Sequence, residues 1–119
     1  MNEIDKIQLY RTAWKHWGGE SQINMVMEEM AEFTQAILKT RRNGVTYSYA
    51  FFDEFADVLI CLEQLEVALK DFPDGQGRSL WDDVIEKKER KLKRLYDRLM
   101  ESMTESIPEG TADLINGSR

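Results

Sequence analysis

Residues 21–39, SQINMVMEEMAEFTQAILK, predict a helix with one apolar side. Apolar side chains recur there at intervals of three and four residues, which is the repeat of an α-helix. Ser21 supplies the hydroxyl group of an N-cap at the start of this helix. The same helix carries three glutamates, Glu28, Glu29 and Glu32. The predicted apolar stripe consists of Ile23, Val26, Met30, Phe33 and Ile37.

A second helix with acidic residues is predicted over residues 47–70. Its apolar side chains are again spaced by four and three residues, as in a core seam, and it also holds Glu54 and Asp57. Residues 40–46 contain an Asn-Gly pair and predict the turn between the two helices. The predicted seam consists of Phe51, Phe55, Val58, Leu62, Leu65 and Leu69.

Two further helices are predicted over residues 2–17 and 80–103. Gly18 and Gly19 end the first of them. A loop with proline and glycine precedes the last helix, for which Ser79 is the expected cap. The apolar stripes are Ile4, Ile7, Tyr10, Trp14 and Trp17 in the first helix, and Trp81, Ile85, Leu92, Leu95, Leu99 and Met103 in the last.

Four helices, with no segment of strand-like period, predict an all-α fold of the small four-helix-bundle type. Residues 1–104 form the predicted domain, and residues 105–119 form a polar, flexible tail. The two acidic helices are expected to run antiparallel. Because so short a chain buries a modest core and has three Trp and five Phe, we expect a homodimer or homotetramer to complete the bundle.

The composition excludes several functional classes. Sixteen basic and twenty-two acidic side chains give a net charge of −6, so no global surface for duplex nucleic acid or an anionic membrane is expected. No apolar run approaches the ~20 residues that span a bilayer. The single cysteine, Cys61, excludes an internal disulfide and a cysteine-based zinc site. Residues 1–10 alternate polar and apolar side chains, unlike a signal peptide, so we expect a cytoplasmic protein.

The acidic residues fall at matching positions on their two helices. Glu29 and Glu32 lie about 60° apart around one helix, and so do Glu54 and Asp57 around the other. If the helices fold antiparallel about the turn, Glu32 falls opposite Glu54 and Glu29 falls opposite Asp57. The spacing therefore predicts that four carboxylates converge, with Glu28 at the edge of the group.

Converging carboxylates favour a divalent cation. Their mutual repulsion is costly unless positive charge is present, and Mg²⁺ and Mn²⁺ prefer carboxylate oxygens. A solvated acidic flank is the alternative, since such flanks are common on helices. The apolar neighbours Met30, Phe33 and Val58 favour the metal site.

The acidic pattern resembles a known family. Glu-Glu-x-x-Glu at residues 28–32, followed after 21 residues by Glu-x-x-Asp at residues 54–57, resembles the signature of the all-α NTP pyrophosphohydrolases. These are the MazG-like proteins, related to dimeric dUTPases and phosphoribosyl-ATP pyrophosphohydrolase. The resemblance extends over residues 14–99 and includes the basic stretch at residues 91–95.

The resemblance implies a Mg²⁺-dependent hydrolase, with Mn²⁺ as a substitute, that cleaves a (d)NTP to a (d)NMP and pyrophosphate in nucleotide-pool house-cleaning. Glu29, Glu32, Glu54 and Asp57 would ligate metal, and Glu28 would ligate a further ion or position the attacking water. Phosphoanhydride hydrolysis needs cations and an activated water, and this acidic set can provide both without a catalytic His or Cys.

The helix over residues 80–103 is basic at residues 87–98, whereas residues 1–86 carry a net charge of −8. Lys88 falls on the apolar stripe of this helix, and a lysine there requires an anion. It either pairs with the acidic cluster or reaches a substrate phosphate; a solvated helix face is the ordinary alternative for such a charge run. The candidates for phosphate contact are Lys88, Lys91, Arg94 and Lys39.

Recognition of the base is assigned to three residues upstream of the first acids. Trp14 and Trp17 offer rings for stacking, and Asn24 offers a hydrogen-bonding amide. Packing in the core or an interface is the competing role of both tryptophans, because their spacing continues the apolar stripe of the first helix.

Two non-enzymatic interpretations also remain. A helical interaction module would use the acids as surface charge and the last helix as a homo-oligomeric seam. A nucleic-acid-associated protein would use residues 87–98, although the charge of the remaining chain disfavours it.

Overall fold

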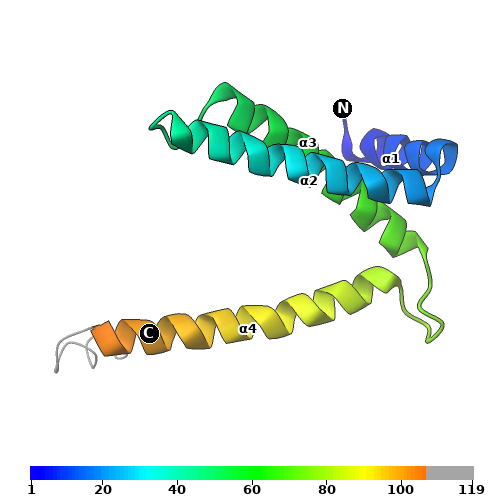
Figure 1. Ribbon diagram of the computed structural model, residues 1–119. Coiled ribbons are helices and arrows are strands. Elements are labelled where there is room, and N and C mark those ends of the chain that lie inside the picture. Colours follow the sequence, from blue (N-terminus) through cyan, green and yellow to red (C-terminus); the bar gives the residue numbers. More distant parts are fainter. Residues whose placement is uncertain (107–119) are drawn as a thin grey trace. The chain divides into compact units, whose positions relative to one another are not determined.

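The structure, a computed structural model, describes residues 1–106. These residues form four α-helices and no β-strand, which confirms the predicted all-α class. The last helix includes the first two residues of the predicted tail, and residues 107–119 lie outside the described residues. The helices, labelled in Figure 1, are α1 (Glu3–Trp17), α2 (Gly19–Arg42), α3 (Tyr49–Asp71) and α4 (Leu80–Ser106).

The chain divides into two compact units, Met1–Trp81 and the residues from Asp82 onward. The first unit contains α1, α2 and α3, and nearly all of α4 belongs to the second. None of the helices in residues 1–106 is long and apolar enough to cross a membrane.

Within the first unit, α2 and α3 pack along each other as an antiparallel hairpin (Figure 1). Helix α1 packs mainly against α3 and also contacts α2. This confirms the predicted antiparallel relation of the two acidic helices. The hairpin is the element that places the acidic motifs side by side.

The start of α2 differs from the prediction, because the helix begins at Gly19 and Ser21 lies inside it. Gly18 is the C-cap of α1 and also the N-cap of α2, so one residue joins the two helices. Its φ of 89° is a conformation that favours glycine. A Cβ atom on Gly19 would lie 3.2 Å from the ring of Trp14, so close packing favours glycine there as well.

The predicted turn between the acidic helices begins too early. Helix α2 continues to Arg42, and Thr40 lies within it and is buried. The Thr40 hydroxyl lies 2.6 Å from the hydroxyl of Ser48, which is the N-cap of α3. The Ser48 hydroxyl also accepts a hydrogen bond of 3.1 Å from the amide of Phe51. Thr40 therefore ties the end of α2 to the start of α3.

The buried face of α2 is not the predicted stripe. Its buried residues are Gln22, Ala36 and Thr40, whereas Ile23 and Met30 of the stripe are exposed. Helical period identifies the most apolar face of a helix, but it does not identify the neighbour that covers that face. Helix α2 contacts α3 through Phe33 of the stripe and through the adjoining, more polar face that carries its buried residues.

The seam of α3 is also only partly as predicted. Val58 is buried, but Phe55 and Leu62 of the predicted seam are exposed. Cys61 and Ala68 are buried in their place, because α3 contacts two helices and orients its smaller side chains toward them. Likewise, Tyr10 of the α1 stripe is buried, whereas Ile4 and Trp17 are exposed.

Polar contacts fix α1 against α3. Arg11 donates two hydrogen bonds to the Asp71 carboxylate, at 2.8 and 2.9 Å. The Tyr10 hydroxyl donates a hydrogen bond of 2.6 Å to Glu63, and the Lys6 ammonium group lies 3.6 Å from the same carboxylate. The acidic residues of this contact therefore have donors or cations as partners.

Candidate metal centre and adjoining cavity

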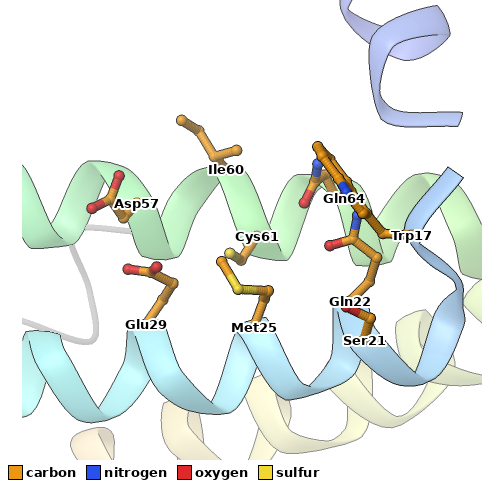
Figure 2. Close-up of a pocket in the computed structure, with 9 residues that line it drawn as sticks. All are labelled: Trp17, Ser21, Gln22, Met25, Glu29, Asp57, Ile60, Cys61 and Gln64. Carbon is orange, nitrogen blue, oxygen red and sulfur yellow. The ribbon is translucent and has the colours of Figure 1, made fainter. Parts of the chain in front are cut away.

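Three carboxylates from two helices converge in the α2–α3 hairpin. One oxygen from each of Glu29, Glu54 and Asp57 can be chosen so that all three lie within 4.8 Å of one another. Figure 2 shows Glu29 on α2 and Asp57 on α3 facing each other across the hairpin. These three residues therefore lie close together, as their matching positions about the turn predict.

Aromatic packing fixes the hairpin close to the acids. Phe33, next to Glu32 in the sequence, stacks on Phe55, next to Glu54, with ring centroids 5.0 Å apart. Phe51 packs edge-on against Phe33 at 5.3 Å. These rings set the register of α2 against α3, and the register sets the approach of the carboxylates.

The electrostatics of the cluster disfavour full ionisation. Burial, followed by the negative charges of Glu32, Asp57 and Glu54, raises the pKa of Glu29 above its ordinary value. The pKa of Glu54 is raised by burial first and then by the charges of Glu32 and Asp57. A bound cation would reverse this balance, because it stabilises the ionised carboxylates.

Two carboxylate oxygens lack any hydrogen-bond partner. The Oε2 atoms of Glu29 and Glu54 are out of contact with solvent and accept no hydrogen bond from any residue in the range 1–106. The ion pairs of Lys6, Arg11 and Lys70 are formed with other carboxylates and not with Glu29, Glu54 or Asp57. Unpartnered oxygens between two helices are the ligand type that Mg²⁺ and Mn²⁺ prefer, so the residues present fit such an ion.

The other two predicted acids lie at the margin of this group. Glu32 is exposed, and it raises the pKa of Glu54 through its charge and a side-chain hydrogen bond. Glu28 is exposed, and of the four neighbouring acids its charge raises the pKa of Glu29 the least. The arrangement thus has three central carboxylates, a fourth in contact and a fifth at the edge.

A cavity of about 450 Å³ adjoins the acids and lies between α2 and α3. Its volume is in the range of small-molecule sites, ~300–1,000 Å³. Figure 2 shows Glu29 and Asp57 at one end and Gln22, Gln64 and Trp17 at the other, with Met25 and Cys61 between them. The full lining is Trp17, Ser21, Gln22, Met25, Glu29, Asp57, Ile60, Cys61 and Gln64.

Sequence reasoning missed the two glutamines of this cavity. Gln22 precedes Glu29 by seven residues, and Gln64 follows Asp57 by seven, so each lies about two turns from its acid on the same helix face. Glu29 and Asp57 lie at matching distances from the turn between their helices. The same is true of Gln22 and Gln64, which are therefore opposite each other. The seven-residue offsets were therefore a signal that the sequence already contained.

The three residues assigned to base recognition have different locations. Trp17, 63% exposed, lines the cavity. Trp14 packs edge-on against Phe72 at 6.4 Å and lines a separate, smaller cavity between α1 and α3. Asn24 is exposed and lines neither cavity. The structure therefore brings only Trp17 to the cavity beside the acids.

The residues assigned to phosphate contact lie on two helices, α2 and α4. Lys39 is exposed in the last turn of α2, seven residues beyond Glu32 and about 10 Å farther along the axis. Lys88, Lys91 and Arg94 lie on α4, in the second unit. Their contact with a phosphate group remains a prediction.

No protein-family model, curated protein or solved structure matches this chain. The geometry of the site and the resemblance of its acidic motif are therefore the basis for proposing a function.

Proposed function

We propose that this protein is a Mg²⁺-dependent nucleoside triphosphate pyrophosphohydrolase of the MazG-like type, acting on the nucleotide pool of the cytoplasm. The observation that carries the proposal is the convergence of Glu29, Glu54 and Asp57, with two buried oxygens that have no hydrogen-bond partner among the described residues. Their order and spacing along the chain resemble the motif of that family.

Each part of the site has a place in this reaction. Glu29, Glu54 and Asp57 would hold the ion, with Glu32 beside them and Glu28 at the edge. A bound Mg²⁺ ion supplies positive charge for the phosphate oxygens and lowers the pKa of a bound water. The adjoining cavity supports binding of the nucleoside, because its walls are mainly apolar and Trp17 offers an aromatic face.

Self-association is part of the proposal, with phosphate contacts from Lys88, Lys91, Arg94 or Lys39. Large apolar side chains on α2 and α3 remain exposed, among them Met27, Phe52 and Leu59. Along α4, considered by itself, Leu92, Leu95 and Leu99 form an exposed stripe. Apolar surface of this extent is typical of a surface that a partner covers. It also supports the second candidate, a homo-oligomeric interaction module without catalysis.

Incubation of the purified protein with a panel of NTPs and dNTPs tests the proposal. We expect a nucleoside monophosphate and pyrophosphate as products with Mg²⁺ or Mn²⁺, and no turnover with EDTA. If no nucleotide is hydrolysed and Mg²⁺ does not raise the melting temperature, the interaction module is favoured instead. Analytical ultracentrifugation of the same sample measures the oligomeric state.

A further inference from the structure

One side of the α2–α3 hairpin exposes large apolar side chains. They follow each other at helical spacing along both helices, and each of them is 40–60% exposed. None of them lines the cavity beside the acids. We call this surface the hairpin face, and it consists of Ile23, Met27, Met30 and Leu38 on α2 and Phe52, Phe55, Leu59 and Leu62 on α3.

The two apolar stripes lie on the same side of the hairpin. At 100° per residue, the centre of each stripe lies about 130° further around its helix than the buried residues do. A local twofold rotation relates two antiparallel helices, so equal angles lead to the same side. Phe33, one turn after Met30, stacks on Phe55 and joins the stripes. Asp57 lies about 140–160° around α3 from its stripe, so it belongs to the opposite side of the hairpin.

The hairpin face has the size of one side of a stable interface. A half-exposed side chain of this kind presents ~100 Å² of surface, so the eight together present ~800 Å². Monomeric proteins rarely expose an apolar patch larger than a few hundred Å². A standard protein–protein interface buries ~800 Å² on each partner. The hairpin face is therefore large enough to hold a partner without further contacts.

Opposite charges mark the two ends of the α2 stripe. Glu20 lies three residues before Ile23, and Arg41 lies three residues after Leu38. Both charged residues are exposed, and each is about 60° around the helix from the neighbouring stripe residue. A second copy turned end for end would place its Glu20 opposite Arg41, whereas a second copy in the same direction would place like charges together.

One twofold axis can serve both helices. The α2 stripe with its charged ends has its midpoint at residues 30–31, and the α3 stripe has its midpoint at residue 57. These two midpoints lie at nearly the same level of the hairpin, because Glu29 faces Asp57 (Figure 2). A twofold axis at this level would pair α2 with α2 and α3 with α3 over their full apolar length.

We propose that two copies of this chain pair end for end through the hairpin face, about a twofold axis. Helices α2 and α3 of both copies then form an antiparallel four-helix bundle, with Arg41 of each copy beside Glu20 of the partner subunit. The acidic cluster stays on the outside of this bundle. The stripe of α4 from a second copy fits less well, because Lys88 within that stripe would meet only apolar side chains.

Sedimentation equilibrium of the full chain tests the interface. Leu59→Glu places a charge inside the hairpin face, so the Kd of the dimer should rise by about a hundredfold or more. Leu95→Glu makes the same change at an exposed position of α4, and this matched control should keep the wild-type Kd. Because both positions are exposed, both variants should keep the helical circular-dichroism spectrum. A monomeric wild type, a dimer that Leu59→Glu does not weaken, or loss of the dimer only in Leu95→Glu overturns the inference.

Charge reversal tests the end-for-end arrangement. Arg41→Glu or Glu20→Arg alone creates two contacts between like charges in each dimer, so each should raise the Kd by about tenfold. The two changes combined should restore most of the affinity. Lys39→Glu alters the net charge equally but lies about 140° around α2 from the stripe, so it should leave the Kd unchanged. A combined variant no tighter than the single ones would contradict this arrangement. These measurements use no nucleotide, so their failure would leave the hydrolase proposal standing.

Discussion

Two sets of carboxylates in the first unit differ in what surrounds them. At the α1–α3 contact, Asp71 receives two hydrogen bonds from Arg11, and Glu63 receives one from Tyr10. Between α2 and α3, Glu29 and Glu54 each have a buried oxygen with no hydrogen-bond partner in the part of the chain that the structure describes. The hydrogen bonds and charge of Arg11 lower the pKa of Asp71, whereas burial and like charges raise the pKa values of Glu29 and Glu54.

The contrast separates two roles for the same type of side chain. Acids that join helices are already paired within the protein, and their removal should affect stability. Acids that face one another without a cation are costly in the free protein, and this cost is relieved by a ligand. Mutation, metal, and pH should therefore affect the two sets in opposite ways.

The largest expected effect is on hydrolysis. Asp57→Asn keeps the shape of the side chain but removes one charge from the proposed metal site, so kcat/KM should fall by about a thousandfold or more. The helical circular-dichroism spectrum should be unchanged. Asp53→Asn is the matched control, since Asp53 is an exposed aspartate on the same helix outside the cluster. Full activity in Asp57→Asn would show that the ligand assignment is wrong.

The next effect is stabilisation by the metal. Ligand at a concentration of 100 times its Kd stabilises a folded protein by ~2.7 kcal/mol. We therefore expect saturating Mg²⁺ to raise the melting temperature by several degrees at constant ionic strength. Glu29→Gln should reduce this shift and should also raise the melting temperature of the metal-free protein, because one like charge is removed. An equal shift in both proteins would place the ion elsewhere.

The acids were more predictable from sequence than the core that surrounds them. The spacing of the acids about the turn predicts that Glu29 lies opposite Asp57, as observed. This prediction needs only the geometry of two antiparallel helices. The predicted face of α2 was only partly correct, because Phe33 packs on α3 but Ile23 and Met30 are exposed. The spacing of apolar residues along one helix does not indicate which other helix packs against it.

Other features depend on contacts that a linear pattern does not contain. Gln22 and Gln64 could have been found from their seven-residue offsets, but amides in helices usually indicate a solvated face. The separate location of Trp14 follows from its packing against Phe72 and Gly19, which depends on the one-residue connection at Gly18. Roles for the basic residues of α4 require its position relative to the first unit.

At the α1–α3 contact, substitution of Tyr10 should lower stability more than substitution of Arg11. Burial and the Glu63 carboxylate raise the pKa of Tyr10 to about 12. Its folded pKa exceeds the unfolded value of 10.0, so its contribution is present below pH 10 and is lost as the pH rises toward 12. Tyr10→Phe should cost ~1–2 kcal/mol at pH 7 and should lessen the loss of stability between pH 10 and 12. Urea denaturation at each pH measures both effects, and an unchanged alkaline profile would contradict this assignment.

The smallest expected effect separates the two sets by the sign of their pH dependence. The pKa of Asp71 is below its ordinary value of 3.8, so its contribution is present above pH 3.8 and is lost as the pH falls through the folded pKa. The pKa values of Glu29 and Glu54 are above 4.5, so their contribution is present below pH 4.5 and is lost as the pH rises through the folded values. Arg11→Met should weaken the loss of stability below pH 3.8, and it should lower stability only slightly at neutral pH, since the pair is partly exposed. Glu29→Gln should instead reduce the loss of stability above pH 4.5, measured in EDTA. If both variants changed the same limb of the profile, the two sets of carboxylates would not differ in the way their partners indicate.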